Sequence, residues 1–208
     1  MKKAIPLKEY YYDKSLHVQT GQANIITYPD SLHHNPYEPT PYTALEALFA
    51  EYELRYGSQV VDFGCGKGRL SFYLHHYHRV AVKGIEMDQV LLDEAKANLR
   101  SYLQYAKNRG CTIQFLDCLA EDYRITPEDT HFYFFNPFSV TIFQQVVYHI
   151  LASVEDVKRK VDLILYYPNV EYENFLGSDT IFTLKREVVV PGLIEQDSRE
   201  RFLVYGLE

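Results

Sequence analysis

Three glycines at alternate positions form the most informative motif of this sequence. Gly64, Gly66 and Gly68 lie in the segment VVDFGCGKGRL, between a strand-like apolar run and a helical pattern. Because glycine has no side chain, such a turn lets the backbone bend sharply and approach a ligand, while the next helix offers unpaired N–H groups. The carboxyl end of a strand is also where open α/β sheets bind ligands. The motif therefore predicts a nucleotide-like site.

The spacing of these glycines separates several ligand classes. A Walker A loop has the pattern G-x-x-x-x-G-K-[S/T]. If Gly66 and Lys67 were its Gly-Lys pair, the first glycine would fall on Val61 and the Ser or Thr on Gly68. A dinucleotide fingerprint counted from Gly64 would need a third glycine where Arg69 stands. ATP or GTP hydrolysis is excluded by the motif, and binding of NAD or FAD is the weaker alternative.

The same segment resembles motif I of the class I S-adenosylmethionine (SAM) dependent methyltransferases, two apolar residues followed by D/E-x-G-x-G-x-G. The resemblance covers about Val60 to Tyr167. It implies a doubly wound, Rossmann-like α/β fold, a loop that wraps the methionine part of SAM, and an acidic residue that holds its amino end. The residues implied in this part of the site are Asp62, Gly64, Cys65, Gly66 and Gly68.

Acidic residues follow the next two predicted strands. Glu86 comes 20 residues after Gly66, the spacing at which an acid meets a ribose in nucleotide-binding α/β folds. By resemblance Glu86 is the ribose-binding acid, and Met87 lies beside the adenine. Asp117 would lie near the adenine amino group, with the backbone N–H of Cys118 on the ring. Solvated strand-end carboxylates remain the alternative for both acids.

The segment Asn136-Pro137-Phe138 follows the fourth predicted strand, where methyltransferases present their catalytic motif IV. It resembles the N-P-P-[Y/F] motif of enzymes that methylate planar amino groups, in which Asn and a backbone carbonyl accept hydrogen bonds from the target nitrogen and the aromatic ring stacks on the target. The second proline is missing here. Asn136 as helix N-cap with Pro137 at the first helical position is an equally good and compatible interpretation.

A proline-fixed cluster precedes the core. In the segment YEPTPY the prolines restrict the backbone, and the resemblance implies a lid that folds over SAM and the substrate pocket. Tyr37, Thr40 and Tyr42 are the candidate lid residues. We expect residues 1–41 to be an N-terminal arm and lid segment, irregular or a short hairpin, and residues 42–208 to be the methyltransferase domain, the whole being a single domain.

Alternating strand-like and helical patterns predict a mainly parallel, seven-stranded sheet covered on both faces. The expected helices are 42–53, 69–77, a helix from the N-cap Asp88 to a closing Gly110, and 137–154. The expected strands are 60–63, 80–85, 112–116, 131–135 and 161–167, and residues 180–190 and 201–207 are expected to close the sheet as an antiparallel pair.

Composition limits the remaining function classes. The 208 residues carry a formal net charge of −7, which argues against tight, sequence-independent binding of long nucleic acid. Three cysteines without a C-x-x-C pair suggest neither a disulfide framework nor a zinc site, and no long apolar run suggests a membrane span. His75, His76 and His78 suit a solvated helix end better than a metal site. We expect a soluble, cytoplasmic protein with no metal.

The sequence thus predicts a SAM-dependent methyltransferase that produces S-adenosylhomocysteine (SAH). Its acceptor is open; a planar amine on a small molecule, a protein or RNA is favoured, and the transfer would be a direct in-line displacement. The alternatives are a non-catalytic SAM-binding or regulatory protein and an NAD-dependent oxidoreductase. Oligomeric state has no signature in the sequence.

Overall fold

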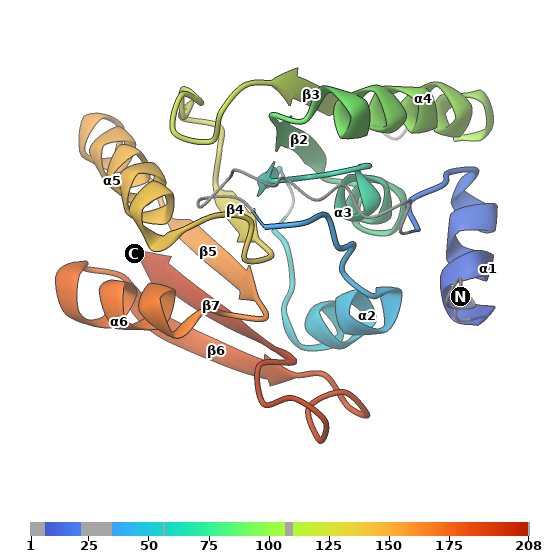
Figure 1. Ribbon diagram of the computed structural model, residues 1–208. Helices are drawn as coiled ribbons and strands as arrows, with labels where there is room; N and C mark the ends of the chain where they lie inside the picture. The colour runs from blue at the N-terminus through green and yellow to red at the C-terminus, as the bar shows by residue number, and fades with distance from the viewer. Residues whose placement is uncertain (1–6, 22–34, 56, 107–109, 208) are drawn as a thin grey trace.

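A computed structural model describes residues 7–21, 35–55, 57–106 and 110–207 of the chain (Figure 1). A seven-stranded sheet runs through the molecule in the order β3-β2-β1-β4-β5-β7-β6. The strands are β1 (Gln59–Phe63), β2 (Ala81–Glu86), β3 (Ile113–Asp117), β4 (His131–Phe134), β5 (Val161–Tyr166), β6 (Thr183–Val189) and β7 (Arg201–Leu207). The first five are parallel, and β7 pairs antiparallel with both β5 and β6. The predicted fold class is therefore confirmed.

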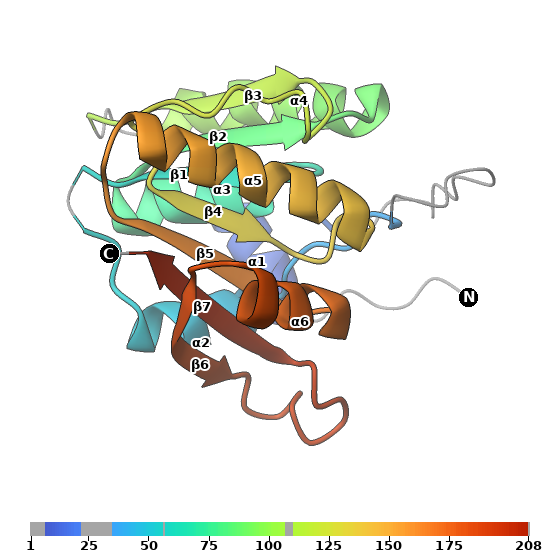
Figure 2. The same cartoon turned by 90° about the vertical axis from the view of Figure 1, so that its left-hand side faces the viewer.

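Helices cover both faces of this sheet (Figures 1 and 2). They are α1 (Leu7–Leu16), α2 (Tyr42–Glu51), α3 (Arg69–Tyr73) with a π-helical continuation (Leu74–His78), α4 (Gln89–Tyr105), α5 (Val140–Asp156) and α6 (Val170–Asp179). Neighbouring β1 residues point to opposite faces, so Val60 joins the core under α2, α3 and α4 while Val61 joins the core under α5 and α6. No helix of the described residues is long and apolar enough to cross a membrane.

Local signals account for the positions of several helices. Asp88 is the predicted N-cap of α4, and its carboxylate accepts hydrogen bonds from the Val90 and Leu91 N–H groups. The amphipathic stripe of α4 then buries Leu91, Ala95 and Tyr102 against the sheet. The predicted stop at Gly110 was wrong, because α4 already ends at Tyr105.

The N-terminal arm differs from the expected irregular segment. Residues 7–16 form helix α1, although their mean hydropathy is low and their apolar residues make no helical stripe. Tertiary contacts supply what the pattern lacks: Leu16 is buried in the core, and Asp13 accepts a hydrogen bond from the Tyr42 hydroxyl at 2.7 Å. Any hairpin within residues 22–34 falls outside the described residues.

Two further differences concern the second half of the chain. Helix α5 begins at Val140 with Ser139 as its N-cap, so the prediction that Asn136 caps the helix and Pro137 opens it was wrong. Helix α6 was not predicted; its N-cap Asn169 accepts a hydrogen bond from the Glu171 N–H, a standard start signal. Strand β7 lies between β5 and β6, so the last strand in sequence is an internal strand of the sheet and β6 is its edge strand.

Candidate functional site

The ends of the parallel strands bring the predicted acidic residues to one edge of the sheet. Register pairs place Phe63 beside both Ile85 and Phe134, and Glu86 beside Asp117. The carboxyl ends of β1, β2, β3 and β4 are therefore neighbours. This is the edge at which open α/β sheets bind ligands.

The glycine loop between β1 and α3 adopts a backbone that side chains would strain. Gly64, Gly66 and Gly68 have φ angles of 74°, 53° and 85°, in the left-handed region that favours glycine. The N–H groups of Gly64 and Cys65 donate to the Ile85 carbonyl at 2.9 and 3.1 Å, which ties the loop to the neighbouring strand. A Cβ atom on Gly64 would lie 2.7 Å from Cβ of Pro137, so the loop also touches the segment after β4.

Glu86 lies against this loop. Its carboxylate accepts hydrogen bonds from the N–H groups of Gly66 and Asp88, both at 2.9 Å. Burial raises the pKa of the Glu86 carboxyl although these backbone donors lower it. A carboxylate has about four lone-pair positions. Glu86 therefore keeps acceptor capacity for hydroxyl donors of a ligand.

Asp62 is the second buried acid of this edge. Burial in the first place, and the neighbouring charge of Glu86 in the second, raise the pKa of Asp62 to about 8. A cation placed beside the pair would lower that pKa again, because an opposite charge favours the ionised form. The two acids thus form a site suited to a positively charged group.

The other predicted cofactor residues differ in exposure. Met87 is 41% exposed and Asp117 is exposed, so both lie open to a ligand, and Cys118 is half-buried. The side chain of Cys65 points into the core, because a Cβ atom on Gly84 would lie 2.7 Å from its Sγ atom. Burial raises the pKa of the Cys65 thiol well above its usual value. Cys65 can therefore serve a ligand only through its backbone.

The segment after β4 presents Asn136 but not Phe138. Asn136 has a φ angle of 40°, a left-handed conformation that Asn tolerates better than most residues. Its Oδ1 atom is buried without a hydrogen-bond partner in the part of the chain that the structure describes. The ring of Phe138 instead packs edge-on against Phe134. The backbone carbonyl of Phe138 accepts a hydrogen bond from the Tyr172 hydroxyl. The structure thus does not bring Phe138 to the site.

The predicted lid residues lie in three different places. The Tyr37 ring packs on the glycine loop, because a Cβ atom on Gly66 would lie 2.0 Å from its Cε2 atom, and its hydroxyl donates to the Thr20 carbonyl at 2.8 Å. The Thr40 hydroxyl lies 2.7 Å from the buried Tyr133 hydroxyl. Tyr42 is fully buried in the core. Of the three, Tyr37 is the residue that covers the loop.

Arg69 is a residue that the sequence analysis missed. It opens α3 directly after the glycine loop and is buried. Its guanidinium binds the Glu9 carboxylate of α1, the Thr20 hydroxyl at 2.7 Å and the Thr40 carbonyl at 3.2 Å. Because charged residues are rarely buried, nothing in the local sequence indicates this role. Arg69 fixes the N-terminal arm to the start of the loop's helix.

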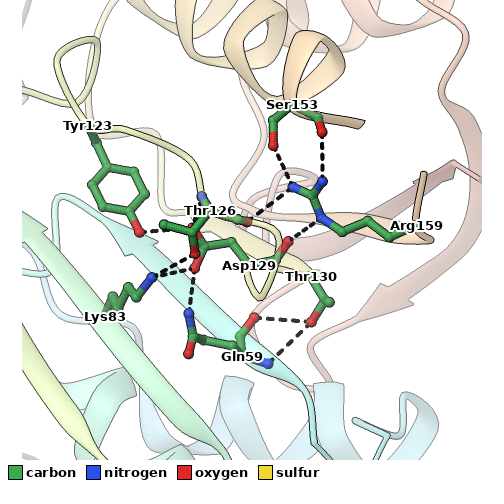
Figure 3. Close-up of polar contacts among 8 residues, drawn as sticks. All are labelled: Gln59, Lys83, Tyr123, Thr126, Asp129, Thr130, Ser153 and Arg159. Atoms are coloured by element: carbon green, nitrogen blue, oxygen red, sulfur yellow. Dashed lines mark hydrogen bonds and ion pairs between the residues drawn. The ribbon is translucent and has the colours of Figure 1, made fainter. Parts of the chain in front are cut away.

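A hydrogen-bond network near the amino ends of β1 and β4 anchors the loop that follows β3 (Figure 3). Asp129 is fully buried and accepts from Lys83 at 2.9 Å, the Tyr123 hydroxyl at 2.9 Å and the Thr126 N–H at 2.7 Å. The Arg159 guanidinium donates to the Asp129 carbonyl at 3.0 Å. The network holds the segment that begins at Asp117 and ends at β4.

A groove of about 660 Å³ lies at the opposite edge of the sheet, at the amino ends of β4 and β5. His131 and Asp162 line it, and it contains none of the predicted site residues. The described residues contain no group of three or more His, Cys, Asp or Glu that could hold a metal ion. His75, expected at a solvated helix end, is instead buried with Nδ1 2.8 Å from the Tyr102 hydroxyl.

Comparison with known proteins agrees with this geometry. The profile of a family described as methionine biosynthesis protein MetW matches residues 47–101, about a quarter of the chain, from α2 through the glycine loop into α4. A search of curated protein sequences gives no match.

Several solved structures share the fold at low sequence identity. An RNA methyltransferase from Salinibacter ruber, solved with SAH, has a TM-score of 0.57 at 16% identity, covering 81% of this chain and 92% of that chain. A SAM-dependent methyltransferase from Thiobacillus denitrificans, also with SAH, has a TM-score of 0.53 at 14% identity over 81% and 91% of the two chains.

A third example acts on a small molecule. Geranyl diphosphate C-methyltransferase from Streptomyces coelicolor A3(2), solved with Mg²⁺, geranyl diphosphate and SAH, has a TM-score of 0.54 at 12% identity, over 79% of this chain and 77% of that chain. Strand order, glycine loop and these likenesses agree, and the chain has the Rossmann-like fold of the class I SAM-dependent methyltransferases.

Proposed function

We propose that this protein transfers a methyl group from SAM to an acceptor that bears a planar amino group. The observation that carries the proposal is the glycine loop with Asp62 and Glu86 buried beside it at the carboxyl edge of the sheet. Structures with the same fold were solved with SAH, the product of such a transfer.

The residues of this edge fit the proposed methyl donor. The Tyr37 ring fills the space above Gly66, which has no Cβ atom, and the methionine part would take this space by displacing the ring. Glu86 has acceptor capacity left for two ribose hydroxyls, and Asp62 with Glu86 offers negative charge to an ammonium group. Met87 and the Cys118 N–H would lie along the adenine, with Asp117 at its amino group.

The chemistry required of the protein is positioning. SAM supplies a methyl group that is activated by its sulfonium charge, so that the acceptor lone pair forms a new bond to carbon while the carbon–sulfur electrons remain on sulfur. Asn136 would hold the acceptor by an N–H group, and the surplus proton of the methylated product would pass to solvent when the arm opens. Fixing reactants in line accounts for large rate factors without a covalent enzyme intermediate.

The N-terminal arm would close the site. Residues 1–41 form the proposed lid segment ahead of the methyltransferase domain, 42–208. Tyr37 would cover the donor, and the buried Thr40 would fix the segment to Tyr133 of β4. Tyr42 would support the lid from within the core. This arrangement would exclude water from the reacting groups.

The proposal of a planar amine as acceptor is supported by Asn136 and not by the substrates of the similar structures. The similar structures include an RNA methyltransferase and an enzyme for geranyl diphosphate, so the shared fold selects neither. The net charge of −7 disfavours long nucleic acid as a bulk partner and favours small or local targets. From the same sequence composition we propose that the enzyme is cytoplasmic.

Transfer of label tests this function. The protein would be incubated with SAM labelled in its methyl group and with a panel of amines, amides and nucleobases. We expect label in at least one acceptor, and a loss of about a hundredfold or more in Asn136→Ala, the range typical for one oriented polar group. Binding of SAM without transfer to any acceptor would indicate a non-catalytic, regulatory protein.

A further inference from the structure

One residue of the N-terminal arm hydrogen-bonds to the backbone where an acceptor would lie. The Asn35 side-chain Nδ2 donates to the carbonyl of Asn136 at 2.6 Å. The Asn35 backbone N–H donates to the carbonyl of Pro137 at 3.1 Å. Two N–H groups of one residue thus occupy two neighbouring carbonyls of the segment after β4.

A third oxygen at the same place has no donor. Oδ1 of Asn136 is buried and unpartnered among the described residues. Carbonyl and amide oxygens accept hydrogen bonds and do not donate them. A buried acceptor without a partner is unfavourable, so the site is incomplete as it stands. A molecule that presents N–H groups can donate to these oxygens.

Asn35 also belongs to the segment that covers the proposed donor site. Tyr37, two residues further along the chain, packs on Gly66, and Asn35 packs on the segment after β4. Gly64 and Pro137 are in contact, so these two positions are adjacent parts of one site. Asn35 itself is exposed and is not part of the core.

We propose that the Asn35 carboxamide is an internal stand-in for the methyl acceptor, which presents a planar NH₂ group and displaces Asn35 when it binds. This inference rests on the proposed function and deepens it. The two N–H groups of the acceptor donate to the Asn136 carbonyl that the Asn35 side chain leaves and to the unpartnered Oδ1 of Asn136. Asn35 therefore competes with the acceptor and sets its apparent affinity, because affinity falls with the fraction of open sites.

Calorimetric titration of small probes tests the competition. Benzamide carries a planar NH₂ group, and methyl benzoate is a neutral molecule of similar shape without N–H. Both are titrated into protein saturated with SAH. We expect Asn35→Ala to bind benzamide about fivefold tighter than the unmodified protein, since the side-chain hydrogen bond to the Asn136 carbonyl, of ordinary strength, no longer opposes it. Methyl benzoate should gain less than twofold.

Matched variants separate the proposal from general loosening of the arm. Glu38→Ala removes another exposed side chain of the same segment and should leave benzamide affinity unchanged. Asn35→Asp keeps the shape and the backbone N–H but loses the side-chain donor, and should strengthen benzamide binding as Asn35→Ala does. Thermal unfolding would verify that each variant is folded.

The outcomes are distinct from those of the proposed function. Unchanged benzamide affinity in both Asn35 variants would overturn the inference. An equal gain in affinity for methyl benzoate would also overturn it, because the variants would then have removed only a steric obstacle and the site would not recognise N–H groups. If SAH binds to none of these proteins, the proposed function itself fails. If SAH binds normally while benzamide does not respond, the inference alone fails.

Discussion

At the scale of single residues, the site is defined by two acids that share a buried edge. Asp62 and Glu86 are both buried, and each disfavours the charge of the other. Such a pair is costly to keep ionised without a cation. A ligand that carries an ammonium group would relieve this cost, which makes its binding sensitive to pH.

The pH dependence of SAH binding follows from the raised pKa of Asp62, about 8. Below pH 8 the carboxyl of the free protein is protonated, and binding an ammonium group requires its proton to leave. SAH affinity should therefore rise as the pH increases from 6 to 8, by at most about tenfold per pH unit. Calorimetry at several pH values measures this. Asp62→Asn should bind more weakly and show a flat profile; a profile in the variant as steep as in the unmodified protein would contradict the assignment.

Gly66 supports a second prediction at this scale. In Gly66→Ala the new Cβ atom would meet the Tyr37 ring, at a φ angle of 53°. Left-handed strain of about 1–2 kcal/mol and overpacking of about 1–3 kcal/mol should both reduce the free energy of unfolding, measured in urea.

Gly192→Ala is the matched control, because Gly192 has a φ angle of 83° with open space around it. It should show the strain alone. In a double-mutant cycle, adding Tyr37→Ala to Gly66→Ala should restore the part of the free energy of unfolding that the clash removes. Equal costs for Gly66→Ala and Gly192→Ala would mean that the ring does not pack on the loop.

At the scale of elements, the arm is fixed to the sheet domain by α1. Arg69 at the start of α3 reaches Glu9 of α1, and the Arg69 guanidinium lies 4.5 Å from the centre of the Tyr42 ring. Since α3 begins immediately after the glycine loop, the arm and the loop share this anchor. The position of the proposed lid segment would therefore depend on a residue outside it.

Replacement of Arg69 by methionine should leave the Glu9 carboxylate without its charged partner, with the Tyr42 N–H as its remaining donor. Removing one member of a buried pair costs about 3–5 kcal/mol, so Arg69→Met should lower the free energy of unfolding by an amount near this range in urea denaturation. Arg199→Met removes a solvent-exposed pair with Asp197 and should lower the free energy of unfolding far less. Similar small losses in both variants would refute the anchoring role.

The sequence predicted the sheet well because its strands and helices carry local patterns. Apolar runs marked β1, β2, β4 and β5, and the Asp88 cap marked α4. Helix α1 escaped prediction because distant partners, Arg69 and Tyr42, stabilise it. A propensity pattern cannot show such contacts.

The same distinction applies to the candidate site. The spacing of its glycines and acids is local information and could be read directly. The inward turn of Phe138 toward Phe134 and the placement of Asn35 on Asn136 depend on tertiary packing. The helix start was assigned to Asn136 because Asn-Pro is a common start signal, but the left-handed backbone at Asn136 moves the cap to Ser139.

At the scale of the whole molecule, the Asp129 network joins strands β1 and β2, helix α5 and the two loops that lead into β4 and β5 (Figure 3). Gln59 of β1 donates to the Asp129 carboxylate at 2.6 Å, beside the contacts from Lys83 and Tyr123. Burial alone would raise the pKa of Asp129, but the Thr126 N–H, Lys83 and other donors lower it below its usual value.

Acid should therefore remove a stabilising contribution from this network. Because the pKa of Asp129 is lower in the folded state than in the unfolded one, its contribution is complete above about pH 4 and is lost as the pH falls through the folded pKa. Asp129→Asn should cost about 2–4 kcal/mol at pH 7, and this difference from the unmodified protein should shrink at pH 3. Asp156→Asn, at the exposed end of α5, is the control and should cost little at either pH. A difference that does not depend on pH would contradict the assignment.

Parallel calorimetric titrations with SAH and NAD test most directly whether the glycine-loop edge binds SAM and its product. We expect one SAH bound per chain and no heat from NAD. Glu86→Ala should weaken SAH binding at least tenfold, while Glu155→Ala on the far end of α5 leaves it unchanged. Binding of NAD but not of SAH, or binding of neither, would contradict SAM binding at this edge.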